Sequence, residues 1–142
     1  MIAIIRISGI PEMPERAAET LNRMRLRKKF ACILLSEKQE NAGMINKVDN
    51  FTAYGKIDKE TLIELIKARG KLIGGKKGKI DAEHIAHELL DSKTEKKLID
   101  FGLKPFFSLH PPRGGIDSKK HFPKGVLGNH GDKINELIRR ML

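Results

Sequence analysis

The chain has 142 residues, of which 28 are Lys or Arg and 18 are Asp or Glu, so its formal net charge is +10. A chain of this length buries about two thirds of its unfolded surface, and its 39% of apolar residues suffices for one core. The single cysteine, Cys32, excludes an intrachain disulfide and a Cys-rich zinc site. The apolar run at 2–7 is interrupted by Arg6 and is too short for a signal peptide or a membrane span. We therefore expect a soluble, cytoplasmic protein.

The first part of the chain predicts the element order β-α-β-α-β. The β-branched run 2–7 is typical of a strand, and an amphipathic helix is predicted over 14–25. The continuously apolar run 30–35 favours a central strand that is buried on both faces. Asn41 is predicted to cap a short helix, and a third strand follows at 51–57.

Residues 58–142 predict a helical extension, packed with the core at 1–57 in one compact unit. Asp58 and Asp81 each precede an apolar stripe at helical spacing and are predicted to cap a helix. The intervening segment 74–79 contains only Gly and Lys, so we expect an exposed basic loop.

The last third combines helical signals with many helix breakers. Ser92 and Glu95 match a capping box for a short helix that ends at Gly102. Residues 103–131 contain four of the six prolines and five glycines, which predicts an irregular arm whose part from 106 to 124 is mobile in the free protein. Asp132 is predicted to cap the last helix.

The sequence gives little support to catalytic, metal or nucleotide sites. The run 70–77 has the spacing of a phosphate-binding loop, but Lys77 stands where Ser or Thr must bind magnesium, and a helix precedes the run. Three side chains on one predicted helix face could hold a metal ion or could simply be solvated: His84, His87 and Glu88. Cys32 is predicted to be a core residue. We therefore expect no enzyme, no metal and no cofactor.

Positive charge is concentrated in two parts of the chain. Residues 1–57 carry 10 basic and 6 acidic side chains, residues 58–101 carry 10 and 9, and residues 102–142 carry 8 and 3. Such an excess points first to phosphate as a partner; the alternative is that it only keeps the protein soluble. Five basic residues lie within 23–29 without an acidic residue among them, which predicts a phosphate-binding surface.

The arm carries the more specific binding pattern. Within 106–115, two prolines hold the chain extended, two glycines allow close approach, and Arg113 offers a bidentate fork, a combination that suits structured RNA. Phe106 and Phe107 could stack on bases or could anchor the arm to the core. The residues predicted to bind RNA are Arg23, Arg25, Arg27, Lys28, Lys29, Lys47, Lys76, Lys77, Lys79, His110, Arg113, Gly114, Gly115, Lys119, Lys120, His121, Lys124 and Asn129.

Short segments across the chain match one family in order and spacing. In the first half they are Thr20-Leu21, the Met-Arg-Leu-Arg of 24–27, the Gly-Met-Ile-Asn-Lys-Val of 43–48 and Tyr54-Gly55. In the second half they are 62–70, the Pro-Pro-Arg-Gly-Gly of 111–115, His121-Phe122, Gly128-Asn129 and 138–141. Together they resemble the L-thirty family of large-subunit ribosomal proteins, whose eukaryotic members are called L-seven.

This resemblance implies an α+β fold: a three-stranded antiparallel sheet of order 3-1-2 with two helices on one face, somewhat like a ferredoxin, and a helical extension. It implies a structural, RNA-binding constituent of the large ribosomal subunit, with ribosomal RNA and neighbouring ribosomal proteins as partners. Because the chain starts directly at the first strand, it resembles the archaeal form. Ser108 stands where members usually carry Arg or Lys, which removes one expected phosphate contact. The alternative is a ferredoxin-like enzyme or binding domain that holds a phosphorylated small molecule at the 74–79 loop.

Overall fold

The computed structural model describes residues 1–7, 13–36, 39–75, 78–91, 97–115, 120–122 and 124–142. Its helices and strands are β1 (Ile2–Arg6), α1 (Glu15–Arg23), β2 (Ala31–Leu35), α2 (Gln39–Val48), β3 (Thr52–Lys56), α3 (Lys59–Arg69), α4 (Ala82–Leu90), β4 (Phe107–Ser108), β5 (Gly128–Asn129) and α5 (Ile134–Met141). Short 3-10 turns lie at Ile73–Gly75, Leu98–Phe101 and Gly131–Lys133.

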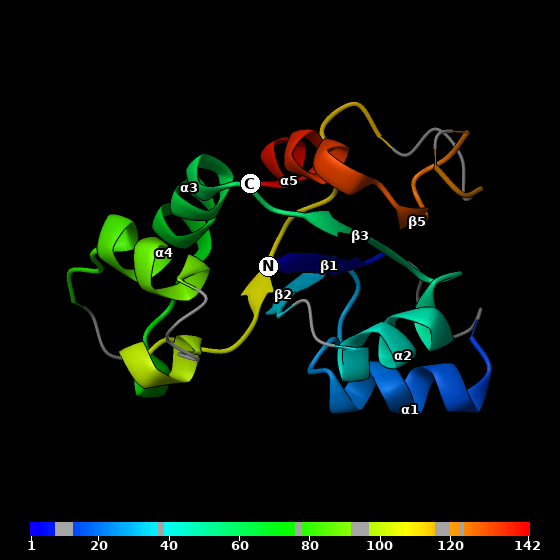
Figure 1. Ribbon diagram of the computed structural model, residues 1–142, viewed down its shortest axis with the longest axis horizontal. Coiled ribbons are helices and arrows are strands. Elements are labelled where there is room, and N and C mark those ends of the chain that lie inside the picture. The colour runs from blue at the N-terminus through cyan, green and yellow to red at the C-terminus, as the bar shows by residue number, and fades with distance from the viewer. Residues whose placement is uncertain (8–12, 37–38, 76–77, 92–96, 116–119, 123) are drawn as a thin grey trace.

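The strands form one sheet of order β4-β2-β1-β3-β5 (Figure 1). β1 lies at its centre and pairs antiparallel with both neighbours, so that Ile4 stands opposite Ile33 on one side and Tyr54 on the other. This confirms the predicted β-α-β-α-β order and the strand order 3-1-2. The structure adds a two-residue strand at each edge, β4 antiparallel to β2 and β5 parallel to β3.

The alternation of side chains along β1 supplies two separate cores, one on each face of the sheet. Ile4 packs under α1 and α2, in a core that also contains Leu21, Leu26, Ile33, Ile45 and Val48. Ala3 and Ile5 point to the other face, which is covered by apolar residues of α3, α4 and α5. Figure 1 shows α1 and α2 side by side, apart from those three helices. Two helices therefore share one face, as the resemblance implies.

Two of the predicted helix caps are present. The Asp58 carboxylate accepts a hydrogen bond from the Thr61 amide at 2.7 Å, and the Asp81 carboxylate accepts one from the His84 amide at 3.1 Å. Cys32 is fully buried in β2, and burial raises the pKa of its thiol to about 12. The assignment of Cys32 to the core is confirmed.

Two other predicted caps are wrong. Asn41 lies inside α2, and its side-chain nitrogen Nδ2 donates back to the Ser36 carbonyl at 2.8 Å. Asp132 does not cap α5: it lies inside the 3-10 turn Gly131–Lys133, Lys133 occupies the N-cap position of α5, and no side chain makes a capping hydrogen bond there. The Asn135 side-chain nitrogen Nδ2 instead donates to the Asp132 carbonyl at 2.8 Å.

The irregular arm predicted at 103–131 is only partly irregular. β4 and β5 both lie within it, and Leu103 forms a bridge with Leu72. Pairing with the edges of the sheet therefore forms strands here despite the many prolines and glycines of this segment. The proposed Ser92–Glu95 capping box lies outside the described residues, while Gly102, at φ 74°, ends the 3-10 turn Leu98–Phe101.

Candidate nucleic-acid interface

The first predicted basic surface is the α1–β2 loop, residues 24–30. α1 ends in a Schellman motif, in which the Leu26 amide donates to the Leu21 carbonyl at 2.9 Å and the Arg25 amide donates to the Asn22 carbonyl at 3.1 Å. Leu21 and Leu26 are both fully buried, so the motif anchors the loop to the core. The backbone of the loop is therefore fixed by the protein itself.

Arg25 occupies the position of this motif that normally holds glycine. Its φ is 65°, in the left-handed region. A side chain there costs about 1–2 kcal/mol because its Cβ crowds the backbone. The Arg25 side chain is exposed, so no apolar packing compensates for the strain. Strain of this kind at an exposed residue indicates a functional constraint.

Arg6 holds the two ends of the α1–β2 loop together. It is 2% exposed, and its guanidinium donates to the Leu26 carbonyl at 2.8 Å, while its own carbonyl accepts from the Phe30 amide at 2.7 Å. Burial lowers the pKa of the Arg6 guanidinium. Sequence reasoning missed this role, although a cation within an apolar strand was a visible signal.

The cations of the α1–β2 loop project into solvent. Arg25, Arg27 and Lys28 are exposed, and their side chains have no partner in the described part of the chain. The Lys29 ammonium lies 5.2 Å from the centre of the Phe30 ring. Arg23, at the end of α1, pairs with Glu19 at 2.7 Å, but both are largely exposed and such a pair contributes little.

The second surface is the PPRGG loop, residues 111–115, which is fastened to the end of α5. The Arg113 amide donates to the Arg140 carbonyl at 3.0 Å. The Arg140 guanidinium donates in return to the carbonyls of Arg113 at 2.9 Å and Gly115 at 2.7 Å. The backbone of the PPRGG loop is therefore hydrogen-bonded within the protein at these residues. The Arg113 side chain is exposed on a fixed backbone.

Several predicted RNA-binding residues instead bind within the protein. The ring nitrogens of His110 lie against the main-chain oxygens of Pro111 and Leu142. His121 Nε2 and the Asn50 side-chain oxygen form a 2.8 Å hydrogen bond. The Asn129 side-chain oxygen accepts from the Gly131 amide at 2.9 Å. These side chains position their loops.

The remaining predicted residues are distributed over the surface. Lys47, Lys79, Lys120 and Lys124 are exposed, as are Gly114 and Gly115. Lys76, Lys77 and Lys119 lie outside the described residues. Phe107 is 1% exposed and anchors the arm to the core. The alternative of base stacking by Phe107 is therefore wrong.

The neighbourhood of the 74–79 loop lacks the context of a nucleotide-binding loop. The 74–79 loop follows helix α3, whereas a nucleotide-binding loop follows a strand. A shallow pocket of about 350 Å³ lies beside the loop, and Lys71 and Lys104 contribute to the lining of that pocket. The His84 ring meets the Phe101 ring edge-on, with 6.3 Å between centroids. No cluster of three His, Cys, Asp or Glu side chains with metal-binding geometry occurs among the described residues.

Comparison with known proteins identifies the family. Residues 2–51 match the family model for ribosomal protein L30p/L7e. The protein named large ribosomal subunit protein uL30 from Desulfurococcus amylolyticus is 41% identical, over 100% of this chain and 98% of its own length. Proteins of that name from Archaeoglobus fulgidus and Methanococcus vannielii are 36% and 38% identical over at least 98% of both chains. The chain belongs to the uL30 family.

The uL30 family model covers β1 to α2 and therefore includes the α1–β2 loop. The PPRGG loop lies outside that model but inside the full-length match to the archaeal uL30 proteins. In the described part of this uL30 chain, no helix has the length and apolar character needed to cross a membrane.

Proposed function

We propose that this chain is a structural constituent of the large ribosomal subunit and that it binds ribosomal RNA through the α1–β2 loop and the PPRGG loop. The observation that carries the proposal is its similarity, over nearly its whole length, to proteins named for that subunit. The net charge of +10 supports RNA as the partner.

The proposed mechanism is electrostatic and geometric. Arg25, Arg27, Lys28 and Arg113 are exposed cations on loops whose backbones are already hydrogen-bonded to the core. A preformed loop loses little conformational entropy when it binds, so more of the phosphate attraction remains as affinity. Arg25, Arg27 and Arg113 can each form bidentate hydrogen bonds to phosphate oxygens.

Partners follow from this mechanism. Ribosomal RNA would contact the two basic loops, and neighbouring ribosomal proteins would be further partners. The place of action would be the ribosome, in the cytoplasm. Arg139, which pairs with Glu64 at 3.5 Å, already has a partner within the protein and is not assigned to RNA.

Sedimentation of cell extracts tests the proposal. The protein should pellet with large subunits and remain there through a moderate-salt wash. A protein found only in the soluble fraction would contradict the proposal and would favour the alternative, a binding domain for a phosphorylated small molecule at the 74–79 loop.

Binding of the purified chain to large-subunit RNA gives a second test. Each phosphate contact contributes about 0.7–0.9 to the slope of log affinity against log salt concentration, so the four cations on the two loops predict a slope of about 3. Arg113→Lys keeps the positive charge but cannot form the bidentate hydrogen bonds of a guanidinium, so the affinity should fall while the salt slope stays nearly unchanged. A wild-type slope near 1 would contradict the proposed surfaces.

A further inference from the structure

Two large apolar side chains are exposed in the described part of the chain, and their backbones are joined through one residue. Ile73 is 46% exposed and Ile99 is 45% exposed, whereas the other described isoleucines and leucines are buried or half-buried. The Ile73 amide donates to the Gly102 carbonyl at 2.8 Å, and the Gly102 amide donates to the Ile99 carbonyl at 2.9 Å. Single exposed apolar residues are common on protein surfaces, but these two share a neighbour and form a small patch.

Glycines leave the surface around the two isoleucines open. Gly102 is exposed with φ 74°, and a Cβ added there would meet no other part of the chain within 4 Å. Gly74 and Gly75, which follow Ile73, are also exposed and equally open. A partner chain can therefore approach the backbone closely here. We call Ile73, Gly74, Gly75, Ile99 and Gly102 the isoleucine face; none of its residues is charged.

Two lysines stand opposite each other beside the isoleucine face. The bridge between Leu72 and Leu103 pairs Lys71 with Lys104, whose amide donates to the Lys71 carbonyl at 2.8 Å. Because alternate residues of an extended segment share a side, both lysines lie on the same side as Ile73. Neither ammonium has a partner among the described residues. Like charges directly opposite each other destabilise a pair of strands, so a carboxylate from a partner would relieve their repulsion.

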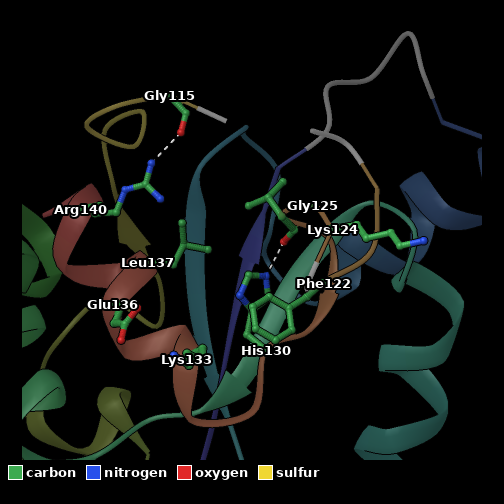
Figure 2. Close-up of a pocket in the computed structure, with 10 residues that line it drawn as sticks. Gly115, Phe122, Lys124, Gly125, His130, Lys133, Glu136, Leu137 and Arg140 are labelled. Atoms are coloured by element: carbon green, nitrogen blue, oxygen red, sulfur yellow. Dashed lines mark hydrogen bonds between the residues drawn. The ribbon is translucent and has the colours of Figure 1, made fainter. Parts of the chain in front are cut away.

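The isoleucine face is separate from the surfaces assigned to RNA. The PPRGG loop is fastened to α5, where Figure 2 shows the Arg140 guanidinium bonded to the Gly115 carbonyl. Figure 1 shows the 3-10 turns Ile73–Gly75 and Leu98–Phe101 side by side at the lower left, with α3 and α4 between them and α5. In the same view α1, which leads into the α1–β2 loop, lies at the lower right.

The composition of the isoleucine face favours protein as its partner. Protein interfaces have an apolar centre and a polar rim, whereas RNA-binding surfaces are marked by clustered positive charge. Aliphatic side chains do not stack on bases as aromatic rings do, and they form no hydrogen bonds. The face also has few residues compared with the roughly 20–30 per side of a standard interface, so it suits a segment rather than a whole domain.

We propose that the isoleucine face binds an extended segment of a neighbouring large-subunit protein. Apolar side chains of this segment pack on Ile73 and Ile99, and an Asp or Glu of the segment pairs with Lys71 and Lys104. This inference rests on the proposed function, and it gives one of the expected protein partners a place and a chemistry.

Zero-length crosslinking of wild-type large subunits tests the inference. A water-soluble carbodiimide joins an ammonium to a carboxylate as an amide with loss of water, so it links only groups in contact. After digestion, mass spectrometry should find Lys71 or Lys104 linked to an Asp or Glu of another large-subunit protein, in a peptide with neighbouring apolar residues. Lys59, which is exposed at the other end of α3, should not be linked to that peptide.

Two results would separate the inference from the proposed function. The absence of a link at both lysines, or links only to carboxylates of this chain or of a second copy, would overturn the docking assignment. Absence of the wild-type chain from large subunits would instead contradict the proposed function.

Ile73→Ser combined with Ile99→Ser tests the apolar part of the contact. Because both side chains are exposed, the melting temperature of the free protein should change little. Affinity for purified large-subunit RNA should equal that of the wild type, while the yield of the crosslink in large subunits should fall several-fold. Lys59→Ser combined with Lys67→Ser, which alters two exposed residues outside the face, is the matched control and should keep the yield. Weaker RNA binding by the isoleucine variant, or equal crosslink losses in both variants, would overturn the inference.

Discussion

Replacing Arg25 with glycine should make the free protein more stable and its RNA complex weaker. Arg25 has a left-handed backbone at the end of α1, where glycine has no steric penalty. The same change removes an exposed cation from the α1–β2 loop. Stability and binding should therefore move in opposite directions, which a purely structural residue would not allow.

The size of both effects follows from the local geometry. Relief of the left-handed strain contributes about 1–2 kcal/mol, and the extra freedom of glycine in the unfolded chain offsets about 0.4–1 kcal/mol of it. A net gain of about 0.5–1 kcal/mol corresponds to a rise of about 2–4 °C in melting temperature for a chain of this size. The loss of one phosphate contact should lower the salt slope by about 0.7–0.9.

Thermal unfolding of the free protein and RNA binding over a salt series measure the two quantities. Arg27→Gly is the matched control, because it removes a cation from the same loop at a residue whose φ is not positive. It should lose a similar part of the slope but should destabilise the fold by about 0.5–1 kcal/mol. If Arg25→Gly lowered the melting temperature, or left RNA binding unchanged, the interpretation of Arg25 as a strained binding residue would be refuted.

Three further predictions concern packing, a buried hydrogen-bond network and pH. A Cβ at Gly55 would lie 2.3 Å from the Gly131 carbonyl oxygen, so Gly55→Ala should lower the free energy of unfolding, measured in urea, by about 2–3 kcal/mol. Gly43 lies in an open part of α2, so Gly43→Ala should raise the free energy of unfolding by about 0.5–1 kcal/mol. Asn135→Ala should lower the free energy of unfolding in urea by about 2–3 kcal/mol. The buried Asn135 side chain accepts a hydrogen bond from the Asp58 amide at 3.0 Å and donates to two carbonyls, and all three bonds are lost in the variant. A loss below about 0.5 kcal/mol would contradict this reasoning. Burial lowers the pKa of His130 in the folded protein, so below about pH 6.5 the unfolded chain binds a proton more readily than the folded chain. The free energy of unfolding should therefore fall as the pH is lowered from about 7 to about 5. It should fall less in His130→Gln, which has no imidazole to titrate.

Local sequence signals predicted the elements that depend on local chemistry. The three long strands have runs of β-branched and apolar residues, and Asp58 and Asp81 cap their helices through contacts only three residues away. The caps assigned to Asn41 and Asp132 failed because the same residue types also occur inside helices and turns. Propensity alone does not distinguish these places.

The features that sequence reasoning missed depend on distant residues. β4 and β5 have two residues each, too few to show a periodic pattern, and they form only because β2 and β3 offer open edges. The PPRGG loop is hydrogen-bonded to Arg140, which lies 25 residues further along the chain than Gly115. The exposed cations of the two loops were predictable from their charge, whereas the role of Arg6 in holding the α1–β2 loop required the tertiary structure.

The two-residue edge strands also bear on aggregation during synthesis. β1, β2 and β3 can pair once residue 56 has been made, but the outer edges of β2 and β3 are covered only by 107–108 and 128–129. An uncovered edge of an apolar strand is a template for pairing with another chain. Until its last quarter has been made, a growing chain is therefore at risk of edge-to-edge association. Truncation after residue 57 should produce insoluble protein, even though the three central strands would all be present.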